Sequence, residues 1–119
     1  MRNIKFTNGI DSLVQALVIG DYLMRHRDLT SDDVFRWAAS EGEIPLKILL
    51  SSHRGAYVSS LRQVACYVLH TRFGVSYAEL GRRVGHTDHT SVKHGVEKVA
   101  RSYELYAQQV EEGFKAYIC

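Results

Sequence analysis

Apolar residues recur at helical spacing along almost the whole chain. Spacings of three and four positions are typical of amphipathic helices, and glycines at 42, 74 and 85 fall where such helices commonly end. The predicted helices cover residues 10–26, about 30–40, 58–72, 76–84 and about 88–117, with a short one after Pro45. No segment alternates long enough to predict a strand, so the sequence predicts an all-α fold.

The apolar rhythm is longest in the last predicted helix. Its members lie mostly four and three residues apart: Val92, Val96, Val99, Tyr103, Tyr106, Val110 and Tyr117. Core packing explains such a stripe most simply, but its length also leaves room for a seam between subunits. Because residues 10–24 carry surplus apolar surface as well, we expect a homodimer.

The small net charge of +2 conceals a basic central segment. Residues 51–101 hold eight Lys and Arg against three Asp and Glu, whereas residues 1–50 hold six against seven. Residues 102–119 hold one against three. This distribution suits a polyanionic partner for one face of the protein.

Other functional classes find no support in the motifs. The chain has no GxxxxGK[ST] loop, no HExxH motif and no nucleophile elbow, so we expect neither nucleotide binding nor catalysis. Cys66 and Cys119 suggest neither a disulfide nor a zinc site, and the histidines at 86, 89 and 94 lack an evident further ligand. No metal or cofactor is therefore expected. The longest apolar run, 17–20, is far too short to span a membrane, and no signal peptide is evident, so we expect a cytoplasmic protein.

Residues 76–94 have the form of a helix-turn-helix. Ser76 and Glu79 form a capping box that opens a short helix, Gly85 supplies the turn, and a second helix follows from about Asp88. An ordinary helical corner has the same shape. The residues of the second helix favour DNA binding. Its first turns hold many short polar side chains, which an ordinary helical corner does not require.

Those polar groups match the chemistry of a DNA duplex. Asp88 can accept from cytosine N4, His89 can donate or accept at a base edge, and the Thr90 methyl can pack on a thymine methyl. Ser91, Lys93 and His94 can reach phosphates. The alternative role of Asp88 is that of a helix cap, and the two roles are compatible.

Two basic positions precede this motif. Arg54 lies on the polar loop 51–55 and is either a solvated surface charge or an arginine that enters a narrow minor groove. Arg62, with its neighbour Gln63, lies near a helix start and can clamp a DNA backbone.

Three segments together resemble the C-terminal duplex-binding domain of the bacterial replication initiators of the DnaA family. They are Arg62-Gln63-Val64-Ala65, Ser76-Tyr77-Ala78-Glu79-Leu80-Gly81, and Asp88-His89-Thr90-Ser91-Val92 with His94. The spacings agree without a gap from about Leu49 to Val99. The resemblance implies an all-α fold related to that of the Trp repressor. It also implies that the domain binds DnaA-box-like sites in the major groove of double-stranded DNA.

The resemblance also implies roles for particular residues. Asp88, His89 and Thr90 would contact bases, and Arg54 falls on the family's minor-groove arginine. The positions that contact the DNA backbone or bases are Arg62, Gln63, Ser91 and His94. The start of the short helix, at Ser76 and Tyr77, would offer amides to a phosphate.

The chain departs from the family pattern at four positions. His86 stands in place of the second glycine of the turn, and Thr87 in place of the basic residue that follows it. Leu61 replaces the proline usual before Arg-Gln, and Lys93 is basic where the family is often apolar. We retain Thr87 and Lys93 as DNA-binding positions.

The predicted organisation has three parts: an N-terminal helical extension (1–33), a DnaA-like helix-turn-helix domain (34–101) and a C-terminal helix extension (102–119). The expected function is non-enzymatic, sequence-specific binding of double-stranded DNA that regulates replication or transcription at the nucleoid. The alternative is a protein–protein adaptor that keeps the fold and dimerises through its terminal helices. The intact Asp88-His89-Thr90 run together with Arg54 favours DNA binding, because an adaptor would not need it.

Overall fold

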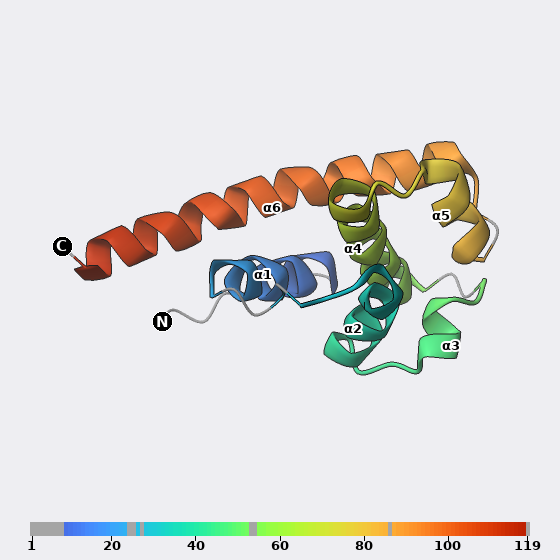
Figure 1. Cartoon of the computed structure of the whole chain (residues 1–119), viewed down its shortest axis with the longest axis horizontal. Helices are drawn as coiled ribbons and strands as arrows, with labels where there is room; N and C mark the ends of the chain where they lie inside the picture. The colour runs from blue at the N-terminus through green and yellow to red at the C-terminus, as the bar shows by residue number, and fades with distance from the viewer. Residues whose placement is uncertain (1–8, 24–25, 27, 53–54, 86, 119) are drawn as a thin grey trace.

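The computed structural model describes residues 9–23, 26, 28–52, 55–85 and 87–118, and side-chain surroundings within these ranges from Leu13 to Gly113. Every regular element in this part of the chain is helical, which confirms the all-α fold. In chain order the elements are α1 (Gly9–Tyr22), the 3-10 turn η1 (Ser31–Asp33), α2 (Val34–Glu41), α3 (Leu46–Leu49), α4 (Ala56–Phe73), α5 (Tyr77–Arg83) and α6 (His89–Ile118) (Figure 1).

Helix α4 is the centre of the packing. It contacts α1, α2, α3 and α6, and it contributes Leu61, Val64, Val68 and Leu69 to the fully buried core. Figure 1 shows α6 running along one side of the molecule, with α5 beside its first turns and α1 alongside its middle. The first turns and the middle of α6 therefore have different neighbours, although the helix itself is continuous.

The apolar stripe of α6 is core packing within one chain. Val92, Val96 and Val99 are buried, and Tyr103, Tyr106 and Val110 are partly buried against the same core. Helix α1, whose Leu13, Val14, Leu17 and Val18 are buried, packs against α6. Much of the surface that led us to expect a homodimer is thus covered by the chain itself, and the homodimer stays a prediction.

Helix α1 ends at Tyr22, earlier than the periodicity through residue 26 predicts. The His26 ring lies over Gly20, where a Cβ atom would overlap the ring. His26 Nδ1 lies 3.0 Å from Asp21 Oδ1. These contacts between residues 20, 21 and 26 are incompatible with a continuing helix, so tertiary packing overrides the local pattern.

The caps predicted from sequence are found in part. Ser76 Oγ accepts from the Glu79 amide at 3.2 Å, which confirms the cap at the start of α5. Gly74 ends α4 in the left-handed conformation, with φ at 68°. The start predicted near residue 30 differs from the structure: a 3-10 turn precedes α2, and the Thr30 hydroxyl donates to Asp33 Oδ2 at 2.8 Å.

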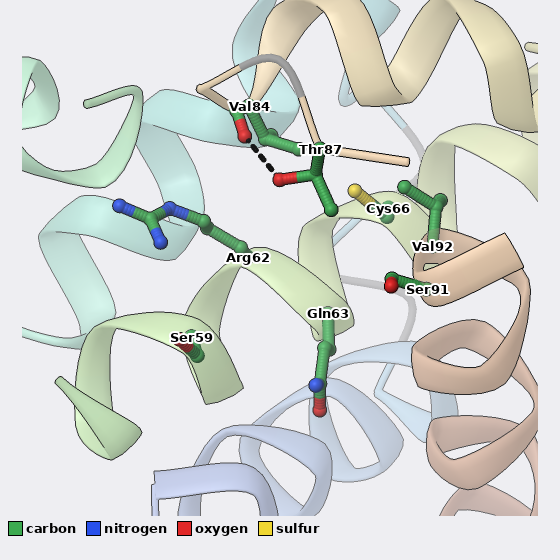
Figure 2. A pocket seen from close by; sticks show the side chains of 8 residues that line it. All are labelled: Ser59, Arg62, Gln63, Cys66, Val84, Thr87, Ser91 and Val92. Carbon is green, nitrogen blue, oxygen red and sulfur yellow. Dashed lines mark hydrogen bonds between the residues drawn. The ribbon is translucent and has the colours of Figure 1, made fainter. Parts of the chain in front are cut away.

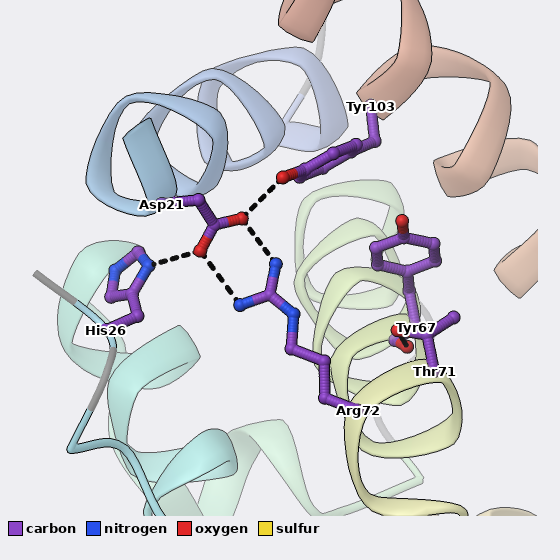
Figure 3. A network of polar contacts seen from close by, with 6 residues as sticks. All are labelled: Asp21, His26, Tyr67, Thr71, Arg72 and Tyr103. Carbon is purple, nitrogen blue, oxygen red and sulfur yellow. Dashed lines mark hydrogen bonds and ion pairs between the residues drawn. The ribbon is translucent and has the colours of Figure 1, made fainter. Parts of the chain in front are cut away.

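A partly buried polar group, the Asp21 cluster (Asp21, His26, Arg72 and Tyr103), joins α1, α4 and α6 (Figure 3). Arg72 donates to both carboxylate oxygens of Asp21, and the Tyr103 hydroxyl donates to Oδ2 at 2.6 Å. Burial by itself would raise the pKa of Asp21, but the hydrogen bonds from Arg72, Tyr103 and His26 outweigh it and lower the pKa. Burial and the bond to Asp21 raise the pKa of Tyr103. The cluster fixes the middle of α6 against α1 and the end of α4.

The described helices include none that is both long and apolar enough to cross a membrane.

Candidate nucleic-acid interface

Helices α5 and α6 form a closely packed helix-turn-helix. The Thr87 amide donates to the Gly81 carbonyl at 2.8 Å, and the Thr87 hydroxyl donates to the Val84 carbonyl at 2.8 Å. A Cβ atom at Gly81 would overlap the Thr87 carbonyl oxygen, so only glycine lets the turn close onto α5. These contacts fix where α6 begins relative to α5.

The turn also packs against the loop between α3 and α4. Gly85 has φ at 71°, in the left-handed region that favours glycine. A Cβ atom at this position would lie 2.8 Å from the Ser51 carbonyl oxygen and 3.1 Å from Ser52 Cα. The helix-turn-helix and the preceding loop are therefore in direct backbone contact.

The first turns of α6 present one face to solvent and one to the core. Val92, Gly95 and Val96 are buried, which anchors the helix from beneath. The exposed residues form what we call the α6 polar surface: Thr87, Asp88, His89, Thr90, Ser91, Lys93 and His94. Each of these is a sequence-predicted site residue, and the structure brings all of them together on one exposed helix start.

Within the α6 polar surface the charges are exposed. His89 Nδ1 lies 3.6 Å from Asp88 Oδ1, and the two side chains are 66% and 64% exposed. At such exposure an ion pair contributes little to stability, so both groups remain available to a partner.

Sequence reasoning missed two arginines at the end of α5. Arg82 and Arg83 have side chains 66% and 42% exposed and pair with Glu79 at 2.6 and 3.2 Å. One carboxylate, that of Glu79, accepts hydrogen bonds from both arginines. These bonds, from Arg82 first and then from Arg83, lower the pKa of Glu79. The sequence does contain a signal for this pairing, because Glu79 lies three and four residues before the two arginines, a spacing that brings side chains together on a helix.

A hollow of about 120 Å³ lies between α4 and the start of α6 (Figure 2). Its lining residues are Ser59, Arg62, Gln63, Cys66, Val84, Thr87, Ser91 and Val92. The buried Gln63 Oε1 has no hydrogen-bond partner among the described residues, and Gln63 lies so close to Gly95 that a Cβ there would be 2.7 Å from Gln63 Cγ. Burial raises the pKa of the Cys66 thiol to about 12, so this cysteine stays protonated and unreactive.

Arg62 points to the chain's own backbone. Its Nε donates to the Leu49 carbonyl at 2.6 Å, and its Nη2 donates to the carbonyls of Ser51 at 2.5 Å and Ile48 at 3.3 Å. Partial burial lowers the pKa of the guanidinium. The position predicted to contact DNA thus holds the end of α3, while Gln63 faces the hollow beside it.

The other predicted positions lie at the start of α5 or outside the described residues. Ser76 is exposed, and the half-buried Tyr77 stacks on His70 with ring centroids 4.1 Å apart. Arg54 and His86 lie outside the described residues. Within the part of the chain that is described, no group of three or more His, Cys, Asp or Glu is placed to hold a metal ion.

Comparison with known proteins points to one family. The family model described as the bacterial dnaA protein helix-turn-helix matches residues 31–99, from η1 through the first third of α6. The chromosomal replication initiator protein DnaA of Thermomicrobium roseum is 36% identical over 86 residues, which cover 72% of this chain and 18% of that protein. DnaA of Nitrobacter hamburgensis is 41% identical over 73 residues, which cover 61% of this chain and 15% of that protein.

The chain spans less than a fifth of the length of these relatives. No solved structure matches it. The matched residues include the glycine-closed turn and the whole α6 polar surface, and they make up more than half of the chain. The chain belongs to the family of bacterial DnaA helix-turn-helix domains.

Proposed function

We propose that this protein binds double-stranded DNA sequence-specifically, with the start of α6 in the major groove. The observation that carries the proposal is the α6 polar surface, which is exposed as one face of a helix that the buried Val92 and Val96 fix from beneath. A major groove about 12 Å wide admits one α-helix, and side chains of its first turns then face base edges.

The side chains suit different parts of the duplex. Asp88, His89 and Thr90 would contact base edges and so select the sequence. Ser91, Lys93 and His94 would contact phosphates, which orient the protein without selecting a sequence. Arg54 would enter the neighbouring minor groove, and the start of α5 at Ser76 and Tyr77 would face a phosphate.

Exposed arginines add positive charge on α5, the helix that packs against α6. Arg82 and Arg83 lie at the end of α5, and with Glu79 between them they carry a net positive charge. The surplus of positive charge over residues 51–101 has the sign that a phosphate backbone requires.

We further propose that the preferred sites are DnaA-box-like and that binding regulates replication or transcription. The matched relatives are named chromosomal replication initiator proteins, which supports this assignment. Thr87 stands where the family has a basic residue, and its hydroxyl is bound to Val84. We therefore expect the preferred site to resemble a DnaA box without being identical to it.

Selection of bound duplexes from a random library tests the proposal most directly. We expect enrichment of one short motif, and fluorescence anisotropy should show tighter binding to that motif than to a scrambled duplex at each salt concentration. Absence of enrichment, with release from heparin at low salt, would favour the adaptor alternative.

Pairing of two chains on DNA is the remaining part of the proposal. A single helix-turn-helix makes few base contacts, and a two-fold arrangement would double them. Light scattering at micromolar concentration, without DNA and with a selected duplex, should reveal a dimer. A mass near 13.5 kDa in the free protein and one chain per duplex would rule it out.

A further inference from the structure

The side chain of Arg62 makes a set of contacts that DNA binding does not require. Its guanidinium crosses from α4 to the last residues of α3 and the loop that follows, where it donates to the carbonyls of Leu49, Ser51 and Ile48. Carbonyls at the end of a helix lack intrahelical partners and carry partial negative charge. A planar cation with several donors is well matched to them.

The same loop contacts the helix-turn-helix. The Ser51 carbonyl that accepts from Arg62 also faces Gly85, at which a Cβ atom would lie 2.8 Å from that oxygen. Thr87, on the far side of the turn, lines the hollow together with Arg62 (Figure 2). The loop that the guanidinium contacts is therefore the loop against which the turn packs, and the Arg62 side chain also lines the hollow beside the start of α6.

We infer that Arg62 is a positioning residue, which holds the α3–α4 loop against the helix-turn-helix turn, and that it is not a phosphate contact. This inference rests on the proposed function. It differs from the role that the family resemblance implies for this position.

The two roles make opposite demands on the side chain. A phosphate contact needs a positive charge, which lysine also supplies, and its loss lowers the salt dependence of binding by about one counterion. A brace on several carbonyls needs the guanidinium fork, which lysine cannot reproduce.

The experiment compares Arg62→Lys and Arg62→Gln by anisotropy on a selected duplex at several salt concentrations. We expect both variants to weaken binding by a similar factor, about tenfold, comparable to one charge-assisted hydrogen bond. The slope of log K against log salt should stay that of the parent protein. Arg36→Lys is the matched control, since Arg36 is exposed on α2 and lies outside the proposed interface.

A second measurement needs no DNA. The Ser51 amide donates to the Ile48 carbonyl at 3.2 Å, so its hydrogen exchange reports on the end of α3. Arg62→Lys should speed this exchange relative to amides in the middle of α4, and Arg36→Lys should not.

Retention of affinity by Arg62→Lys, together with a slope lowered by about one in Arg62→Gln, would overturn the inference. Unchanged Ser51 exchange in Arg62→Lys would overturn it as well. If even the parent protein binds no duplex, the proposed function fails, and the exchange experiment still decides whether Arg62 braces the loop.

Discussion

Two polar regions lie along the same helix and have opposite character. The α6 polar surface exposes its side chains, whereas in the Asp21 cluster a single carboxylate accepts from Arg72, Tyr103 and His26. Polar groups that satisfy one another in a partly buried site hold the fold in one arrangement. Polar groups left exposed on a fixed helix are available to a partner.

The two regions also differ in how they relate to the family. Residues 31–99 include the whole α6 polar surface, but of the Asp21 cluster they include only Arg72. Tyr103 lies 14 residues after His89, or about 21 Å along the helix. The matched domain therefore contains the proposed interface, and the flanking helices add a separate polar attachment at a distance from it.

Gly81→Ala should have the largest effect, because it acts on the turn that sets the start of α6. The new Cβ would overlap the Thr87 carbonyl oxygen, a backbone atom that cannot move without opening the turn. We expect the free energy of unfolding to fall by about 3 kcal/mol, measured by urea denaturation. Gly113→Ala is the control on α6: a Cβ there meets nothing within 4 Å, so stability should stay equal or rise slightly.

Asp21→Asn tests the other region. It removes the charge that pairs with Arg72, and at pH 7 we expect a loss of about 2 kcal/mol, between the values for exposed and buried pairs. DNA specificity, as the ratio of affinities for selected and scrambled duplexes, should change little. A large loss of specificity would show that the two regions are coupled through α6.

The same variant carries a pH signature. The pKa of Asp21 is lower in the folded protein than its ordinary value of 3.8, so its stabilisation is fully present above that value. It is lost as the pH falls through the folded-state pKa. Urea denaturation of the parent protein and Asp21→Asn should therefore differ at neutral pH and converge in strong acid. Asp32→Asn, on the exposed η1, provides a control that should follow the parent protein.

Thr90→Ala removes a methyl and a hydroxyl from the α6 polar surface. We expect affinity for the selected duplex to fall by about 1–2 kcal/mol and affinity for a scrambled duplex to change little, because base contacts specify the sequence. Since Thr90 is exposed, the urea midpoint should stay close to that of the parent protein. Equal losses on both duplexes would assign Thr90 to the DNA backbone.

Lys93→Ala should have the smallest effect. Lys93 is exposed on α6, and its loss should weaken selected and scrambled duplexes about equally, with a salt slope lower by about one. Anisotropy titrations at several salt concentrations give both quantities. If neither Lys93→Ala nor Thr90→Ala alters any affinity, the α6 polar surface does not bind DNA.

The sequence by itself determined the features that depend on local pattern. The spacing of Val92, Val96 and Val99 predicts the buried face of α6, and the polar residues between them are exposed for the same geometric reason. The Ser76 cap and the glycine turn at Gly85 depend only on residues a few positions apart. The all-α fold and the helix-turn-helix followed from these signals.

Tertiary structure decided which long side chains are committed to the protein itself. Arg62 reaches carbonyls 11 to 14 residues away, and Arg72 pairs with Asp21 across 51 residues. Arg82 has a carboxylate at helical spacing, Glu79, but no local spacing predicts what Arg62 and Arg72 contact. An arginine braces a loop, forms a partly buried ion pair or forms an exposed surface pair according to which groups the packing brings within reach of its guanidinium. That outcome depends on contacts between distant segments, which exist only after the chain has folded.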